Sequence, residues 1–181
     1  VGVSSFNYVQ TPTKKLPIYS PSMVSDELVE EDLRYVKKYH RISDFSLFNQ
    51  NGENVTHDNY KNKIYVADFF FTTCPDICPI MTGNMLYLQE NLKNNNDIML
   101  ASFSVTPNVD TVEVLKSYSL EKGVDDSKWN LMTGEKKQIY DLARKSFLVA
   151  KKIHNEQTHG MIHTENFVLV DKDKRIRGYY D

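Results

Sequence analysis

The two cysteines of the chain, Cys74 and Cys78, are the residues whose type and spacing point most directly to chemistry. They lie four residues apart, shortly after the apolar run 64–71. On a helical turn, residues i and i+4 share one face, with Cα atoms roughly 6 Å apart. At that separation two sulfurs can close a disulfide or bind one metal ion together. A third ligand elsewhere in the fold would decide between these uses.

A third ligand would come from another element of the fold, and the histidines are the natural candidates. Among the five, His163 stands out because it lies three residues before the apolar segment 166–170, and His159 is the second candidate. Two thiolates and one imidazole form a soft site that suits Cu(I) in trigonal geometry and can also hold Cu(II) or zinc. The other histidines are His40, His57 and His154.

Three methionines and one carboxylate also bear on the site. Met81 and Met85 could donate sulfur, but their helical spacing favours the core, whereas Met161 stays open as a donor. Asp68 lies inside the apolar run, where an isolated carboxylate is costly. It is therefore either a hydrogen-bonded structural acid or a group that tunes the nearby thiols.

The composition indicates one ordinary globular domain. The chain has 181 residues, of which 40% are hydrophobic and 25% charged. A formal net charge of −2 indicates neither a nucleic-acid partner nor an anionic membrane surface. Two cysteines are too few for a disulfide-stapled scaffold and are the right number for one reactive pair.

Hydrophobic periodicity predicts an alternation of strands and helices between two hairpins. Pro75 is expected in the first turn of the helix that follows the cysteines, and Asp110 with Glu113 is expected to cap a later helix. The predicted elements are a β-hairpin over 44–57 with a type I′ turn at Asn51-Gly52, a buried strand over 64–71, a helix that stops at 94–96, a strand over 98–105, a helix from Asp110 to Gly123, a short apolar segment over 129–132, a helix over 134–147 and a closing hairpin over 166–180.

This order predicts an α/β fold of thioredoxin-like class, with a central mixed sheet flanked by helices, an N-terminal β-hairpin and a C-terminal β-hairpin. Such a fold places a reactive cysteine at a helix N-terminus, where backbone N–H groups favour the thiolate. The loop that enters the last hairpin faces the cysteine loop, which favours His163 as the third ligand. Residues 1–42 are expected to form a partly extended leader or tether, although 25–42 is ambiguous between helix and strand, and 43–181 the domain proper.

The sequence resembles the Sco/SenC family over about residues 42–181. The resemblance rests on C-x-x-x-C-P after a central strand and on a distal His-Thr before the closing hairpin. The matching residues are Phe71-Thr72-Thr73-Cys74-Pro75-Asp76-Ile77-Cys78-Pro79, Asp44-Phe45-Ser46-Leu47, Asn51-Gly52, Asp110-Thr111, Trp129, Leu131, Thr133-Gly134, His163-Thr164, Asp171-Lys172-Asp173 and Gly178-Tyr179-Tyr180.

The resemblance implies a copper-binding protein that helps assemble the copper A centre of cytochrome c oxidase, as a metallochaperone, a thiol reductant or both. Cys74, Cys78 and His163 would be the copper ligands, with Cys74 and Cys78 also forming the redox pair. The implied partners are cytochrome c oxidase subunit II, or another copper-accepting protein, and other copper chaperones. The implied location is extracytoplasmic and membrane-anchored, in the bacterial periplasm or its equivalent, with a tether upstream.

Two other functions stay open on the residues alone. A thiol-disulfide oxidoreductase or redox sensor without a metal needs only Cys74 and Cys78. A peroxiredoxin-type peroxidase is disfavoured, because residues 69–73 contain no proline and the first arginine after Cys74 is Arg144.

Overall fold

The computed structural model describes residues 15–150 and 164–181. Within them, seven strands form one mixed sheet in the order β2-β1-β5-β4-β3-β6-β7. None of the helices in these ranges has the length and apolarity to cross a membrane. The strands are β1 (Ser46–Asn49), β2 (Asn54–Thr56), β3 (Ile64–Phe70), β4 (Ile98–Ser104), β5 (Trp129–Thr133), β6 (Phe167–Val170) and β7 (Ile176–Tyr180). The helices are α1 (Ile77–Leu92), α2 (Val112–Lys122) and α3 (Lys136–Asp141), with short 3-10 helices at Pro21–Met23 and His57–Tyr60 and a π-helical turn at Leu142–Ser146.

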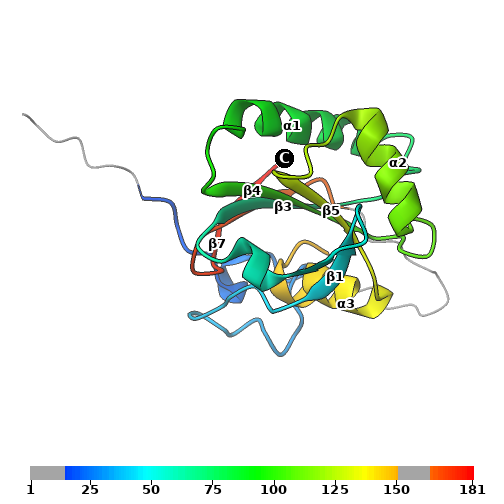
Figure 1. Ribbon diagram of the computed structural model, residues 1–181. Coiled ribbons are helices and arrows are strands. Elements are labelled where there is room, and N and C mark those ends of the chain that lie inside the picture. The colour runs from blue at the N-terminus through cyan, green and yellow to red at the C-terminus, as the bar shows by residue number, and fades with distance from the viewer. Residues whose placement is uncertain (1–14, 151–163) are drawn as a thin grey trace, which may run out of the picture.

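Three parallel strands form the centre of the sheet. β4 pairs in parallel with β3 on one side and with β5 on the other. The β1–β2 hairpin joins β5, and the β6–β7 hairpin joins β3, both antiparallel. α1 and α2 cover one face of the sheet and α3 lies on the other (Figure 1). The predicted central sheet, with a hairpin at each end of the chain, is confirmed.

The near-continuous apolar run of β3 follows from burial on both faces. Phe69 points to the α3 side, where its ring stacks on Phe103 at 5.1 Å. Phe70 points to the other side and packs against Tyr118 of α2, with ring centroids 5.9 Å apart. Because side chains alternate along a strand, Asp68 shares the α1–α2 side with Phe70.

α2 begins and ends with well-defined caps, but its N-cap differs from the prediction. The hydroxyl of Thr111 accepts a hydrogen bond from the N–H of Val114 at 3.4 Å, so Thr111 is the N-cap. The prediction that Asp110 caps this helix is wrong, because its carboxylate has other partners. The predicted end at Gly123 is confirmed, and this residue has the left-handed φ of 79° that glycine accepts readily.

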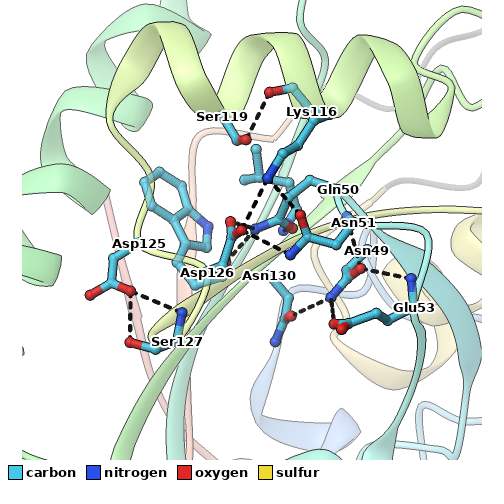
Figure 2. A network of polar contacts seen from close by, with 12 residues as sticks. Asn49, Gln50, Asn51, Glu53, Lys116, Ser119, Asp125, Asp126, Ser127 and Asn130 are labelled. Carbon is cyan, nitrogen blue, oxygen red and sulfur yellow. Dashed lines mark hydrogen bonds and ion pairs between the residues drawn. The ribbon is translucent and has the colours of Figure 1, made fainter.

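The β1–β2 hairpin forms as predicted, but its connection is not a type I′ turn. In the predicted pair Asn51-Gly52, only Gly52 has a positive φ, and its N–H bonds to the carbonyl of Asn49 at 2.9 Å. The side chain of Gln50 is fully buried, donates to the carbonyl of Trp129 at 2.9 Å and accepts from the N–H of Leu131 at 2.8 Å (Figure 2). These bonds to β5 fix a connection that is longer than a two-residue type I′ turn, and only Gly52 in it has a left-handed φ.

The helix predicted over 134–147 is divided into α3 and a π-helical turn. The N–H of Phe147 bonds to the carbonyl of Leu142 at 2.8 Å, the i+5 spacing of a π turn. The ring of Phe147 lies 5.4 Å from those of both Phe69 and Phe103. The wider turn therefore accompanies insertion of this ring into the core.

The segment before the first hairpin contacts the β6–β7 hairpin. The N–H of Tyr19 bonds to the carbonyl of Ile176 at 2.9 Å, and the N–H of Ile42 bonds to the carbonyl of Lys174 at 2.8 Å. Residues 25–42, which the sequence left ambiguous, form turns rather than a regular helix or strand. The division of the chain at residue 42 stays a prediction.

Candidate metal and thiol site

The cysteines lie where β3 gives way to α1. The N–H of Cys74 bonds to the carbonyl of Phe71 at 3.3 Å, which closes a turn directly after the strand. α1 then starts late enough for Cys78 to lie in its first turn and for Pro79 to be its third residue. A proline is tolerated there because the first N–H groups of a helix have no acceptor within it. The prediction that Pro75 lies in the first turn of the helix is wrong. A helix that began there would place Pro79, which has no N–H, at a position whose N–H must donate within the helix.

The two thiols are free, mutually in contact and mostly buried. Cys74 is 9% exposed and Cys78 is 4% exposed. The Cys78 side chain hydrogen-bonds the sulfur of Cys74. Met81 and Met85 share the buried face of α1 with Cys78, so their predicted place in the core is confirmed.

The Cys74 thiol lies among hydrogen-bond donors at the start of α1. Burial raises its pKa, but hydrogen bonds from the backbone N–H groups of Cys78, Asp76 and Ile77, and from the Cys78 side chain, outweigh burial and leave the pKa below its usual value. Helix N-terminal N–H groups favour an anion in this way. Cys74 is therefore the thiol that ionises first.

The Cys78 thiol has the opposite environment. Burial raises its pKa to about 12, opposed by a backbone hydrogen bond from Phe71 and reinforced by Cys74 and Asp68. Cys78 thus stays protonated at neutral pH in the metal-free protein. The pair combines one activated thiol with one protonated thiol.

Asp68 in β3 is buried and hydrogen-bonded. The hydroxyl of Ser102, its neighbour across β3 and β4, donates to the Asp68 carboxyl group, and the indole N–H of Trp129 donates to the Ser102 oxygen at 2.8 Å. Burial raises the pKa of Asp68 to about 7, although the Ser102 bond lowers it in part. Both interpretations of Asp68 that the sequence left open therefore hold. It is a hydrogen-bonded structural acid, and its charge also raises the pKa of Cys78.

Sequence reasoning missed a second buried carboxylate next to this loop. Asp110 is fully buried and accepts hydrogen bonds from the hydroxyls of Thr72 at 2.5 Å, Ser104 at 2.5 Å and Thr106 at 3.1 Å. The backbone N–H of Thr72 also donates to it, at 3.2 Å. The hydroxyl residues at the ends of β3 and β4 were a signal in the sequence that could have indicated this carboxylate. Asp110 was instead interpreted as a helix cap, from the spacing of its immediate neighbours.

The predicted third ligand, His163, lies outside the described residues, as do the alternatives His159 and Met161. Across residues 15–150 and 164–181, no three or more His, Cys, Asp or Glu side chains gather in a way that could hold a metal ion. His40 lies within hydrogen-bonding distance of the Ser146 carbonyl, at 2.7 Å. Within those ranges, the two cysteines therefore have no histidine, aspartate or glutamate as a third ligand.

The chain after this gap enters the sheet at the edge where β3 ends. β6 is antiparallel to β3, and Val168 pairs with Ala67. Continued backwards, this register runs toward the end of β3 from which the cysteine loop departs. Thr164, the first described residue of this segment, is buried, and its hydroxyl accepts a hydrogen bond from the N–H of Asn166 at 3.2 Å.

Comparison with known proteins gives a consistent match over most of the chain. The sequence model of the SCO1/SenC family matches residues 34–181. The SCO1 protein homolog of Bacillus subtilis (strain 168) is 35% identical over 145 residues, which cover 78% of this chain and 74% of that protein.

Solved structures agree in fold. A SCO1/SenC family lipoprotein from Bacillus anthracis strain Ames is 34% identical with a TM-score of 0.69, covering 78% of this chain and 84% of that one. BsSco, a Sco-family cytochrome c oxidase assembly protein with a disulfide switch, is 35% identical with a TM-score of 0.66, covering 78% and 83%. Bradyrhizobium japonicum ScoI, solved with copper bound, is 25% identical with a TM-score of 0.64, covering 79% and 90%. These similarities confirm the predicted thioredoxin-like fold.

Proposed function

The chain belongs to the SCO1/SenC family, and we propose that it binds one copper ion through Cys74, Cys78 and His163. The observation that carries the proposal is the pair of contacting thiols at the N-terminus of α1. Thiolates and imidazole suit Cu(I), and the same three ligands can hold Cu(II). Among the relatives, ScoI of Bradyrhizobium japonicum has copper bound.

The register of β6 supports His163 as the third ligand. His163 directly precedes Thr164, and this segment enters the sheet beside β3, whose end leads to Cys74. A ligand there would approach the thiols from a different element than α1. Such a set leaves one side of the ion open, which suits a protein that receives copper and passes it on.

The proposal extends to a role, a partner and a location. Copper would pass to cytochrome c oxidase subunit II or another copper-accepting protein, after loading by other copper chaperones. BsSco, a relative, belongs to a family of cytochrome c oxidase assembly proteins. Residues 43–181 would carry the site outside the cytoplasm, in the periplasm or its equivalent, with 1–42 as the tether to a membrane anchor. The Bacillus anthracis relative is a lipoprotein.

Residues of this chain would manage the protons that accompany metal binding. Both thiols must lose their protons to bind the ion. The N–H groups around Cys74 already favour its thiolate, whereas Cys78 ionises only when a cation offsets its burial. Copper uptake at neutral pH should therefore release protons, chiefly from Cys78.

The opposite pKa shifts of the two thiols also favour a second function, thiol-disulfide exchange. The Cys74 thiolate would attack a partner disulfide, form a mixed disulfide and release one partner thiolate. Cys78 would then lose its proton and attack the Cys74 sulfur, releasing the second partner thiolate. The products are a reduced partner and a Cys74–Cys78 disulfide, so the step balances.

A competition titration tests the copper proposal. Reduced protein, titrated anaerobically with Cu(I) against bathocuproine disulfonate, should take up one copper ion per chain. His163→Ala should weaken the affinity by about 10-fold or more, because loss of a residue that only supports a metal ligand already costs about 10–100-fold. His154→Ala and His159→Ala are matched controls that should keep the wild-type affinity. Unchanged affinity in His163→Ala would remove that residue from the site, and loss in His159→Ala would assign the role to His159.

A further inference from the structure

Asp110 is a buried carboxylate whose hydrogen bonds join three segments around the cysteine loop. Oδ1 accepts from the Thr72 hydroxyl at 2.5 Å, and Oδ2 accepts from the Thr72 N–H at 3.2 Å. Oδ2 also accepts from the hydroxyls of Ser104, at the end of β4, at 2.5 Å and of Thr106 at 3.1 Å. The carboxylate therefore links the segment after β3 to the end of β4 and to the residues that precede α2.

These four hydrogen bonds replace the ion pair that a buried charge usually needs. Asp110 is fully buried, and no lysine or arginine in the described ranges forms an ion pair with it. Hydrogen bonds to an ionised acceptor are stronger than neutral ones, and their geometry is correspondingly well defined. Two of the four come from Thr72, so Asp110 holds the cysteine loop at a point two residues before Cys74.

The position of Cys74 depends on where that loop lies. Its sulfur accepts hydrogen bonds from N–H groups at the start of α1 and from the Cys78 side chain. The sulfur therefore has to lie between a loop that leaves β3 and a helix that begins at Ile77. Displacement of the loop would therefore disturb the contacts of the Cys74 sulfur with α1 and with Cys78.

We propose that Asp110 is a positioning residue that holds the Cys74 loop, through Thr72, in the geometry in which Cys74 and Cys78 act together. It does not touch the metal or a partner disulfide. The inference rests on the proposed function for its copper readout, but its thiol readout is independent of copper.

Asp110→Asn tests this role with little change of shape. The amide offers one acceptor oxygen in place of two and places an NH₂ donor against hydroxyl donors, so the Thr72 bonds weaken. Loss of support around metal ligands typically costs 10–100-fold in metal affinity, and we expect Cu(I) affinity by bathocuproine disulfonate competition to fall in this range. In metal-free protein, the equilibrium constant for oxidation of the pair by glutathione disulfide should fall by about 10-fold, because a looser loop lowers the effective concentration of one thiol near the other.

Asp126→Asn is the matched control. The carboxylate of Asp126 also accepts several hydrogen bonds. Its donors are Gln50, Asn51 and Lys116, none of which lies in the cysteine loop (Figure 2). This variant should keep both wild-type values.

Thr72→Ala and Thr72→Ser keep the test decisive if Asp110→Asn does not fold. The alanine variant should lower both values in the same direction, and the serine variant, which retains the hydroxyl, should restore most of the loss. Wild-type values in folded Asp110→Asn or in Thr72→Ala would overturn the proposal. A wild-type protein that binds no copper, with a thiol equilibrium that still responds to Asp110→Asn, would refute the copper function and leave this inference standing.

Discussion

Cys74 and Cys78 hydrogen-bond each other, yet their pKa values move in opposite directions. Cys74 precedes α1 and lies among the free N–H groups of its first turn, whereas Cys78 is already inside that turn and faces the buried Asp68. One residue pair thus provides an activated thiol and a protonated thiol. The difference arises from the four-residue spacing across a helix start rather than from any difference in residue type.

The first prediction concerns selective alkylation of the metal-free, reduced protein. At pH 7.5, iodoacetamide should modify Cys74 at least about 30-fold faster than Cys78, since the larger thiolate fraction of Cys74 outweighs its lower intrinsic nucleophilicity. Peptide mapping by mass spectrometry at short reaction times measures both rates. Cys78→Ser is the control that isolates Cys74. Equal rates, or faster reaction at Cys78, would contradict the assignment.

The second prediction concerns the pH dependence of stability that Asp68 introduces. Burial raises the folded-state pKa of this carboxyl group to about 7, above the usual value of about 3.9 for an unfolded aspartate. The folded state therefore binds the proton more tightly, so the contribution is full below about pH 4 and is lost as the pH rises through 7.

Asp68→Asn removes that titration and nearly keeps the shape. Between pH 5 and pH 8, wild-type protein should lose about 2–3 kcal/mol of unfolding free energy relative to the variant. Urea denaturation of both proteins at the two pH values measures the difference. If the unfolding free energies of the two proteins differ by the same amount at both pH values, Asp68 does not titrate between pH 5 and pH 8.

The third prediction concerns Asp171 at the β6–β7 turn, where the pH dependence of stability has the opposite sign to that of Asp68. Burial raises the pKa of this carboxylate, but bonds from Arg175, from Arg177 and from backbone N–H groups outweigh it and lower the pKa overall. Its stabilisation is therefore present above the unfolded pKa and is lost as the pH falls through the folded value.

Asp171→Asn should cost about 1–2 kcal/mol at pH 7, because two arginines then lose a charged acceptor. The loss should begin to shrink below about pH 4, because the aspartate of the unfolded wild type then takes up a proton while the folded carboxylate is still charged. Denaturation at pH 7 and pH 3.5 provides the comparison. A loss that grows on acidification would mean that the carboxylate is not stabilised by these partners.

The fourth prediction compares two glycines that differ in their surroundings. A Cβ at Gly83, in the middle of α1, would meet nothing within 4 Å, so Gly83→Ala should stabilise the protein by about 0.5–1 kcal/mol. A Cβ at Gly134 would lie 2.7 Å from a methyl carbon of the fully buried Leu47, so Gly134→Ala should destabilise by about 1–3 kcal/mol. Thermal unfolding of the two variants under one condition should move the melting temperature in opposite directions, and shifts of the same sign would contradict the packing at Leu47.

Local signals in the sequence were sufficient for the order of the elements and for the place of the cysteines. Three of these signals depend only on contacts within a few residues or on uniform burial. They are the apolar run of β3, the spacing of Met81 and Met85, and the glycine after α2. Such features depend little on which distant segment packs against them. The strand-to-helix junction that carries Cys74 could therefore be predicted.

Features that depend on distant partners could not be predicted. Asp110 satisfies a local capping pattern, but its carboxylate binds Thr72, which is 38 residues away. The turn after β1 carries a favourable Asn51-Gly52 pair, yet Gln50 is held by β5 and changes the turn. In both cases a tertiary hydrogen bond overrides a local preference, and a single sequence does not reveal which distant donor or acceptor will be close.

The most direct test of the account is X-ray absorption at the copper edge on anaerobically loaded protein, with wild type and His163→Ala compared. Two sulfur ligands and one nitrogen ligand per copper ion in the wild type, with the nitrogen ligand lost or replaced in the variant, are the result that we predict. Copper bound without sulfur, or a spectrum that His163→Ala leaves unchanged, would contradict the claim that Cys74, Cys78 and His163 together hold the ion.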